Sequence, residues 1–219
     1  MTKRWLAIGA LLLGVALAGC GGGGSGAGQT TQEQATASAA PTPASGAAPW
    51  PAPPNPLELT RAAGLEPQRR ELLEYHVHSH LDVFVNGEPV PVPAGIGINI
   101  DDPGVQHGQT EEGPAYGGIE LCDQPCISPL HTHDGTGVLH TESLESHPNT
   151  LGEFFTEWGV QLDETCVGGY CRPDASIEVY VNGEKYAGNP ADIELTDRKE
   201  IAVVIGTPPA VIPASYFSA

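Results

Sequence analysis

Hydrophobic and polar residues alternate over residues 76–85, where the chain reads HVHSHLDVFV. This period of two predicts a strand with its valines and Leu81 on one face. Asn86-Gly87 follows directly and predicts a two-residue hairpin turn, and the proline-interrupted return over residues 90–92 suits an edge strand. The other face of the predicted strand carries His76, His78, His80, Asp82 and Phe84.

A second hairpin is predicted over residues 128–142, with its turn at residues 134–137 (DGTG). A four-residue turn pairs His131 with His140 and His133 with Val138. Cross-strand partners of this kind have Cβ atoms about 4.5–5.5 Å apart. One face of this hairpin therefore presents His131, His133, His140 and Glu142.

Residues 151–158 follow the helical period instead. The stretch TLGE at residues 150–153 has the spacing of a capping box, and Gly159 can end the helix. The apolar positions i, i+3, i+4 and i+7 are Leu151, Phe154, Phe155 and Trp158. Because they form one stripe, we expect them to face a core rather than a ligand.

Three other stretches complete the expected fold. Residues 57–75 read as one or two short helices with Pro67 at a first helical position, residues 101–121 as a loop, and residues 192–206 as two strands around a turn. The order of hairpins, helix and further strands predicts an α+β domain. Its expected architecture is a small mixed sheet of hairpins with one packed amphipathic helix, in a β-grasp-like arrangement.

The first hairpin recurs later in the chain. SIEVYVNGEKY at residues 176–186 repeats HLDVFVNGEPV at residues 80–90. Continued upstream, the repeat places Arg172, Asp174 and Ser176 where the first copy has its three histidines. Since the second copy has a strand and an Asn-Gly turn without imidazoles, the histidines of the first copy need another explanation.

Six of the eight histidines lie on the two predicted hairpins, and this concentration favours a metal site over a solvated polar face. Three imidazoles from two strands can hold one ion and leave one coordination position open to water or substrate. Glu142 is a ligand, a partner that orients a ligand, or an exposed residue. Asp134 is rather a turn former than a ligand, and it too is a possible partner that orients a ligand. The candidate ligands are His131, His133 and His140 first, His78 and His80 if the hairpins pack together, and His76.

Imidazole ligands favour zinc or copper(II) as the cofactor. The only methionine is Met1, so a methionine-rich copper(I) site is excluded. His107 and His147 lie in predicted loops, and we assign them no role.

The start of the chain resembles a bacterial lipoprotein signal. Basic residues, a short apolar run and Leu17-Ala18-Gly19-Cys20 follow in the order of a lipobox. The resemblance implies a signal peptide over residues 1–19, lipidation of Cys20, and a cell-envelope protein anchored outside the cytoplasm in a lipid bilayer. Residues 20–56 are rich in Gly, Ala, Ser, Thr and Pro and predict a disordered tether, and residues 57–219 predict one globular His-rich domain.

Charge and cysteine content agree with an exported domain. Seven basic and 27 acidic residues follow Cys20, a net charge near −20, which argues against nucleic acid as a partner. An oxidising compartment predicts two disulfides, local or crossed, and a zinc tetrathiolate is the alternative. The cysteines concerned are Cys122, Cys126, Cys166 and Cys171.

The LHTHD hairpin followed by TLG-x-FF-x-x-WG also resembles a family of exported bacterial and archaeal proteins with no established activity. The similarity spans most of residues 76–206 and implies one domain that contains both histidine segments. We therefore expect a lipid-anchored protein that binds zinc or copper for scavenging, buffering or delivery. The alternatives are a metal-dependent hydrolase or oxidoreductase of unknown substrate, and a β-grasp-like module that binds a protein partner without metal.

Overall fold

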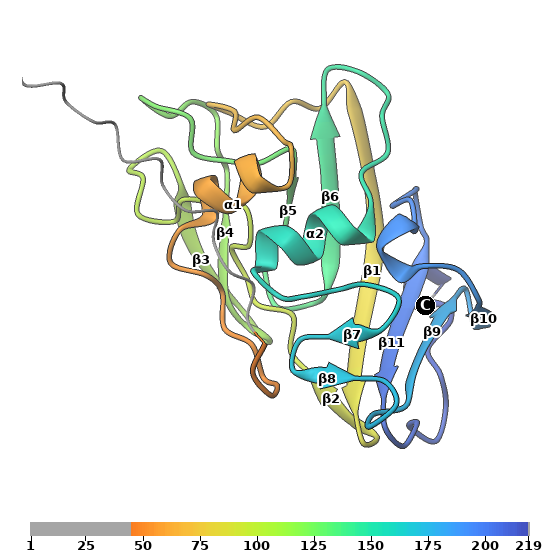
Figure 1. Cartoon of the computed structure of the whole chain (residues 1–219). Helices are drawn as coiled ribbons and strands as arrows, with labels where there is room; N and C mark the ends of the chain where they lie inside the picture. Colours follow the sequence, from red (N-terminus) through yellow and green to blue (C-terminus); the bar gives the residue numbers. More distant parts are fainter. Residues whose placement is uncertain (1–44, 219) are drawn as a thin grey trace, which may run out of the picture. The chain divides into compact units, whose positions relative to one another are not determined.

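A mixed seven-stranded sheet organises the domain in the computed structural model, which describes residues 45–218. Its order is β10-β9-β11-β1-β6-β5, with β2 paired to β1 (Figure 1). β1 runs parallel to β11 and antiparallel to β2 and β6. The strands are β1 (Tyr75–Val85), β2 (Glu88–Val90), β5 (Leu130–His131), β6 (Val138–Ser143), β9 (Ile177–Val181), β10 (Glu184–Tyr186) and β11 (Glu200–Ile205).

Both Asn-Gly turns form as predicted. Asn86 and Gly87 have φ values of 53° and 85°, and Asn182 and Gly183 have 50° and 79°. Two successive positive φ angles define the two-residue turn whose twist matches that of the strands it joins. The two copies of the repeat thus build the hairpins β1–β2 and β9–β10 in one sheet, on either side of β11.

The predicted amphipathic helix is confirmed as α2 (Leu151–Trp158), which lies across one face of the sheet (Figure 1). Thr150 and Glu153 form the capping box, and Gly159 ends the helix in the left-handed conformation. Its apolar stripe is fully or almost fully buried, and each such side chain contributes about 1.5–3 kcal/mol. The α+β prediction, with a mixed sheet and one packed helix, is therefore correct.

The ordered domain begins earlier than the sequence predicts. Trp50 is buried, and its ring meets that of Trp158 edge-on, with centroids 5.7 Å apart. The boundary placed at residue 56 is therefore too late, because an aromatic anchor inside the proposed tether joins the core. The proposed signal peptide, Cys20 and most of the tether lie outside the described residues.

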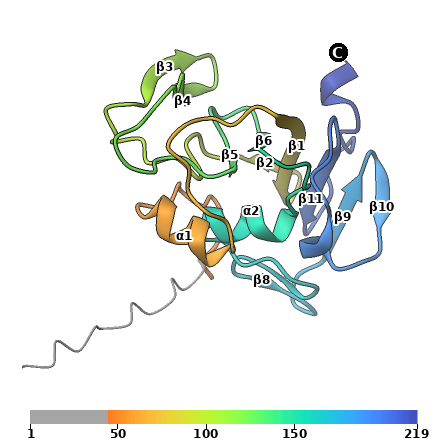
Figure 2. The same cartoon turned by 90° about the horizontal axis from the view of Figure 1, so that it is seen from above.

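Three local predictions are wrong. Of the one or two short helices predicted over residues 57–75, one forms as α1 (Pro56–Ala62), but a second one from Pro67 does not: residues 67–74 are irregular because Gln68 pairs with Ile127. Residues 101–121 contain a hairpin, β3 (Gln106–Thr110) and β4 (Gly113–Gly117), which Figure 2 shows beyond the β5 end of the sheet. Before β11 there is the 3-10 helix η1 (Pro190–Asp192) rather than a strand.

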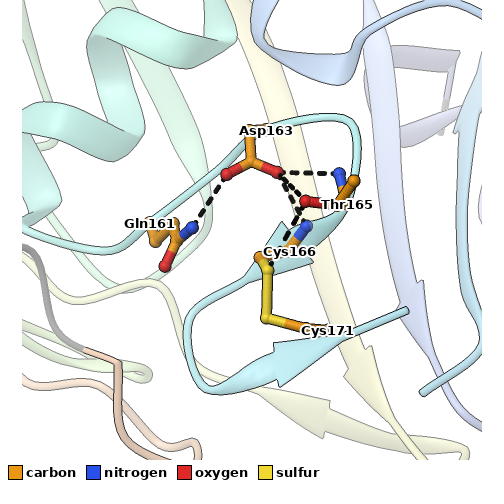
Figure 3. The surroundings of a disulfide bond; sticks show 5 residues. All are labelled: Gln161, Asp163, Thr165, Cys166 and Cys171. Carbon is orange, nitrogen blue, oxygen red and sulfur yellow. Dashed lines mark hydrogen bonds between the residues drawn. A yellow bond between two sulfur atoms is a disulfide. The ribbon is translucent and has the colours of Figure 1, made fainter. Parts of the chain in front are cut away.

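Both disulfides are local: Cys122 bonds to Cys126, and Cys166 to Cys171. This pairing excludes the tetrathiolate alternative. The second bridge joins β7 (Cys166–Val167) to β8 (Tyr170–Cys171), and Asp163 accepts hydrogen bonds from Gln161, Thr165 and the Cys166 amide beside it (Figure 3). Among residues 45–218 we find no helix long and apolar enough to cross a membrane.

Candidate metal centre

The register of three neighbouring strands places imidazoles side by side. His140 on β6 is opposite His78 on β1 and opposite His131 on β5. Leu81, on the alternate face of β1, packs in the core that includes the α2 side chains. Since successive side chains of a strand point to opposite faces, the imidazoles lie on the face of the sheet away from α2.

Four side chains converge at the β5 end of this row. We call His131, His133, His140 and Glu142 the inner group; each offers one ligand atom, and these atoms all lie within 4.8 Å of one another. The Nε2 atoms of His131 and His133 are 3.2 Å apart. Glu142 Oε1 lies 3.4 Å from His140 Nδ1 and 3.8 Å from His131 Nε2. The domain thus has a His/Glu cluster that could hold a metal ion.

Hydrogen bonds fix the tautomers of two rings. His131 Nδ1 lies 2.9 Å from the Ser128 carbonyl oxygen, and His133 Nδ1 lies 2.5 Å from that of Tyr116. A carbonyl only accepts, so each Nδ1 carries a proton and, in a neutral ring, each Nε2 presents a lone pair. The contact between the two Nε2 atoms therefore sets lone pair against lone pair unless a proton or a metal ion lies between them.

Burial argues against the proton. The side chain of His131 is completely buried, and this desolvation, reinforced by the charges of His133 and His140, holds its pKa well below the usual range. Burial likewise lowers the pKa of His140, and burial followed by the charge of His140 lowers the pKa of His78 to about 4. At neutral pH these three rings are in the uncharged form that binds metals.

Glu142 adds a buried carboxyl group with one unsatisfied oxygen to the cluster. Only 2% of this residue is exposed, and its Oε2 atom has no hydrogen-bond partner among the described residues. A buried, unpaired carboxylate oxygen is costly, and a cation at the inner group would offset that cost. The structure places Glu142 in the inner group, where it could serve as a ligand, one of the three roles that the sequence left open.

His80, a predicted ligand, does not join the inner group. Its Nδ1 lies 2.7 Å from Glu200 Oε1 and its Nε2 2.8 Å from the Thr136 carbonyl oxygen, so both nitrogens donate. Burial alone would lower its pKa, but the hydrogen bond and charge of Glu200 outweigh burial, and the pKa of His80 is raised. A doubly protonated ring has no lone pair for a metal, so we interpret His80 as half of a buried ion pair.

Asp134 has the turn-forming role predicted for it. Its Oδ1 accepts hydrogen bonds from the backbone amide and the hydroxyl of Thr136 at 3.0 and 2.5 Å. It is not a member of the inner group. Its effect on the centre is therefore indirect, through the turn that follows His133.

Two further carboxylates near the centre were not predicted. Glu71 comes from the segment wrongly expected to be helical, and its Oε1 lies 3.9 Å from His133 Nε2. Burial and the charge of Glu142 raise its pKa. Glu71, Tyr116 and His133 line a cavity of about 460 Å³, so the centre opens to solvent on this side.

The second unpredicted carboxylate, Glu157 of α2, supports the backbone that orients His131. Glu157 is completely buried, and its Oε1 accepts a hydrogen bond of 2.5 Å from the hydroxyl of Ser128. The backbone carbonyl oxygen of the same serine accepts the hydrogen bond from His131 Nδ1. Burial raises the pKa of Glu157 well above its usual range. Helix and centre are thus linked through one serine, a contact between residues too distant in sequence for a local motif to reveal.

No protein-family model, curated protein or solved structure matches the chain.

Proposed function

We propose that the domain binds one zinc or copper(II) ion at the inner group. The observation that carries this proposal is the 3.2 Å contact between the Nε2 atoms of His131 and His133, two rings whose Nδ1 atoms both face backbone carbonyl oxygens. With metal–nitrogen distances of 2.0–2.1 Å, neighbouring ligand atoms of a tetrahedral site are separated by about 3.3 Å. The observed 3.2 Å, and the 3.4 Å between His140 Nδ1 and Glu142 Oε1, agree with that spacing.

The donor set supports the choice of metal. Three imidazoles and one carboxylate suit zinc or copper(II) better than magnesium or calcium, which prefer oxygen ligands. The cysteines of the described residues are joined in disulfides and offer no thiolate.

The proposed biological role is scavenging, buffering or delivery of the metal by a lipid-anchored protein outside the cytoplasm. Two local disulfides suit an oxidising compartment, and the acidic composition attracts cations. The anchor is Cys20. Replacing it (Cys20→Ser) should move the protein from the membrane to the soluble fraction, and retention in the membrane would contradict lipidation.

Metal content of the purified protein tests the inner group. We expect His131→Ala/His133→Ala to lose the bound ion, measured by native mass spectrometry and elemental analysis. The single variant His133→Ala is included in case the double variant misfolds, because the His133 side chain is 22% exposed and its loss should disturb the fold less. It should weaken metal binding at least 10-fold. His147→Ala, at an exposed histidine outside the cluster, is the matched control. Unchanged metal content in the double variant would exclude the site.

A metal-dependent enzyme is the second candidate function, favoured by the cavity beside His133 and Glu71. Three imidazoles beside an open cavity would leave room for a water molecule on the ion, and Glu71 could accept its proton. Azide added to the copper(II) form tests this access, since an exchangeable coordination position gives a change in the visible spectrum. A spectrum insensitive to azide would instead favour a closed binding site.

A further inference from the structure

A second cluster of imidazoles adjoins the inner group on the β1 side. His76, His78 and His140 each offer a ligand atom, and these atoms also lie within 4.8 Å of one another. We call these three residues the outer group. His78 Nε2 is 3.1 Å from His140 Nδ1, and the rings of His76 and His78 meet edge-on with centroids 4.5 Å apart.

The two groups are joined through two shared side chains. His140 belongs to both. Glu142 Oε1 lies 3.4 Å from His140 Nδ1 and also 3.1 Å from His76 Nε2, so one carboxylate oxygen faces both groups. The other oxygen of Glu142 has no hydrogen-bond partner among the described residues and is free to take part.

One ion cannot use all of these ligands. Ligand atoms on a single zinc are separated by at most about 4.2 Å, twice the zinc–nitrogen distance. The imidazoles form two compact sets that have only His140 in common, rather than one set around a single point. The excess of donors is therefore explained by two neighbouring positions.

We propose that His76, His78 and His140 form a second, weaker position for the same class of ion, bridged to the inner ion by the carboxylate of Glu142, or by His140 once its ring N–H proton is released and each ring nitrogen binds one ion. This inference rests on the proposed function of the inner group. The weaker affinity follows from exposure: the side chain of His76 is 32% exposed, whereas that of His131 is fully buried. Asp197, with Oδ1 3.5 Å from the His78 amide nitrogen, adds negative charge nearby.

Stoichiometry is the direct test, with copper(II) as the probe and the full chain as the protein. We expect the wild type to bind two ions in succession by native mass spectrometry. His76→Ala/His78→Ala should bind one ion with the higher of the two affinities. His107→Ala/His147→Ala, which removes two of the three histidines outside both groups, should bind two ions. Circular dichroism of each variant confirms folding.

Electron paramagnetic resonance supplies an independent readout. Two copper(II) ions bridged by a shared side chain couple magnetically, so the second equivalent should diminish the signal of the first instead of doubling it. In His76→Ala/His78→Ala the signal should stop changing after one equivalent.

The outcomes separate this inference from the proposed function. One tight ion in both the wild type and His76→Ala/His78→Ala would overturn the outer position and leave the inner one intact. One ion in the wild type that His76→Ala/His78→Ala weakens would also overturn it, because a single mixed site would then be present. No bound ion in the wild type would overturn the proposed function itself.

Discussion

At the scale of single residues, identical imidazoles take opposite roles because of partners that are distant in sequence. His78 and His80 stand on the same face of one strand, and the pattern predicts both as ligands. His78 meets His140 and has a lowered pKa, whereas His80 meets Glu200, 120 positions later, and has a raised one. The alternation identifies the face, but protonation depends on which strand lies alongside.

Replacing Glu142 tests its role at this scale, because the substitution should change the metal affinity and the stability of the metal-free protein in different ways. Glu142→Gln keeps the shape and removes the buried charge, so we expect metal affinity to fall about 10- to 100-fold. The apo-protein should be as stable as the wild type or more stable, because an unpaired carboxylate oxygen is no longer buried. Calorimetric titration and thermal unfolding measure the two effects, with the exposed Glu145→Gln as control. Unchanged affinity in Glu142→Gln would remove Glu142 from the ligand set.

At the scale of elements, strong local patterns predict correctly and mixed ones do not. The α2 helix has a capping box, an apolar stripe and a terminal glycine in agreement, and both Asn-Gly hairpins form. The hairpin of β3 and β4 escapes prediction because glycine and acidic residues hide its alternation. Residues 67–74 are paired to Ile127 through Gln68, and tertiary pairing of this kind leaves no local periodicity.

The segment between β2 and β3 gives a test of how closely it approaches β5. Gly97 has a φ of 75°, and a Cβ atom there would lie 2.5 Å from the Leu130 carbonyl oxygen, next to His131. We expect Gly97→Ala to lower both the melting temperature and metal affinity. Gly64→Ala is the matched control, since its φ is 82° but nothing lies within 4 Å of the added atom. Positive φ alone costs about 1–2 kcal/mol, so an equal loss in both variants would contradict a tight contact at Gly97.

The turn before the second disulfide gives a pH-dependent prediction. Hydrogen bonds, first from Gln161 and then from Thr165, lower the pKa of Asp163 from 3.8 to about 2. A depressed folded-state pKa means that the ionised carboxylate stabilises the fold above pH 3.8 and that this contribution is lost as the pH falls through about 2.

Asp163→Asn should therefore lower the free energy of unfolding at neutral pH by at most about 1 kcal/mol, because the group is partly exposed and screened. The difference from wild type should narrow below pH 4, as followed by urea unfolding at several pH values. Glu164→Gln, which removes one charge from an exposed neighbour, should show no such trend. A difference independent of pH would contradict the assigned role of the Asp163 charge.

At the scale of the whole molecule, the sequence predicts the fold class and the packing of the two histidine-bearing hairpins against each other. It predicts less well which residues belong to the candidate metal centre. The α+β sheet, the packed helix and the pairing of His131 with His140 follow from periodicity and turn chemistry. The parallel pairing of β1 with β11 links distant segments, and it is what brings Glu200 to His80. Glu71 and Glu157 reach the centre through tertiary contacts alone, so no motif identifies them.

X-ray absorption spectroscopy of the zinc-loaded protein tests the central claim most directly. Ligation by the inner group predicts a first shell of nitrogen and oxygen at about 2.0–2.1 Å, with the outer-shell scattering of at least three imidazoles. A sulfur shell at about 2.3 Å, or light-atom ligands without imidazole scattering, would contradict it.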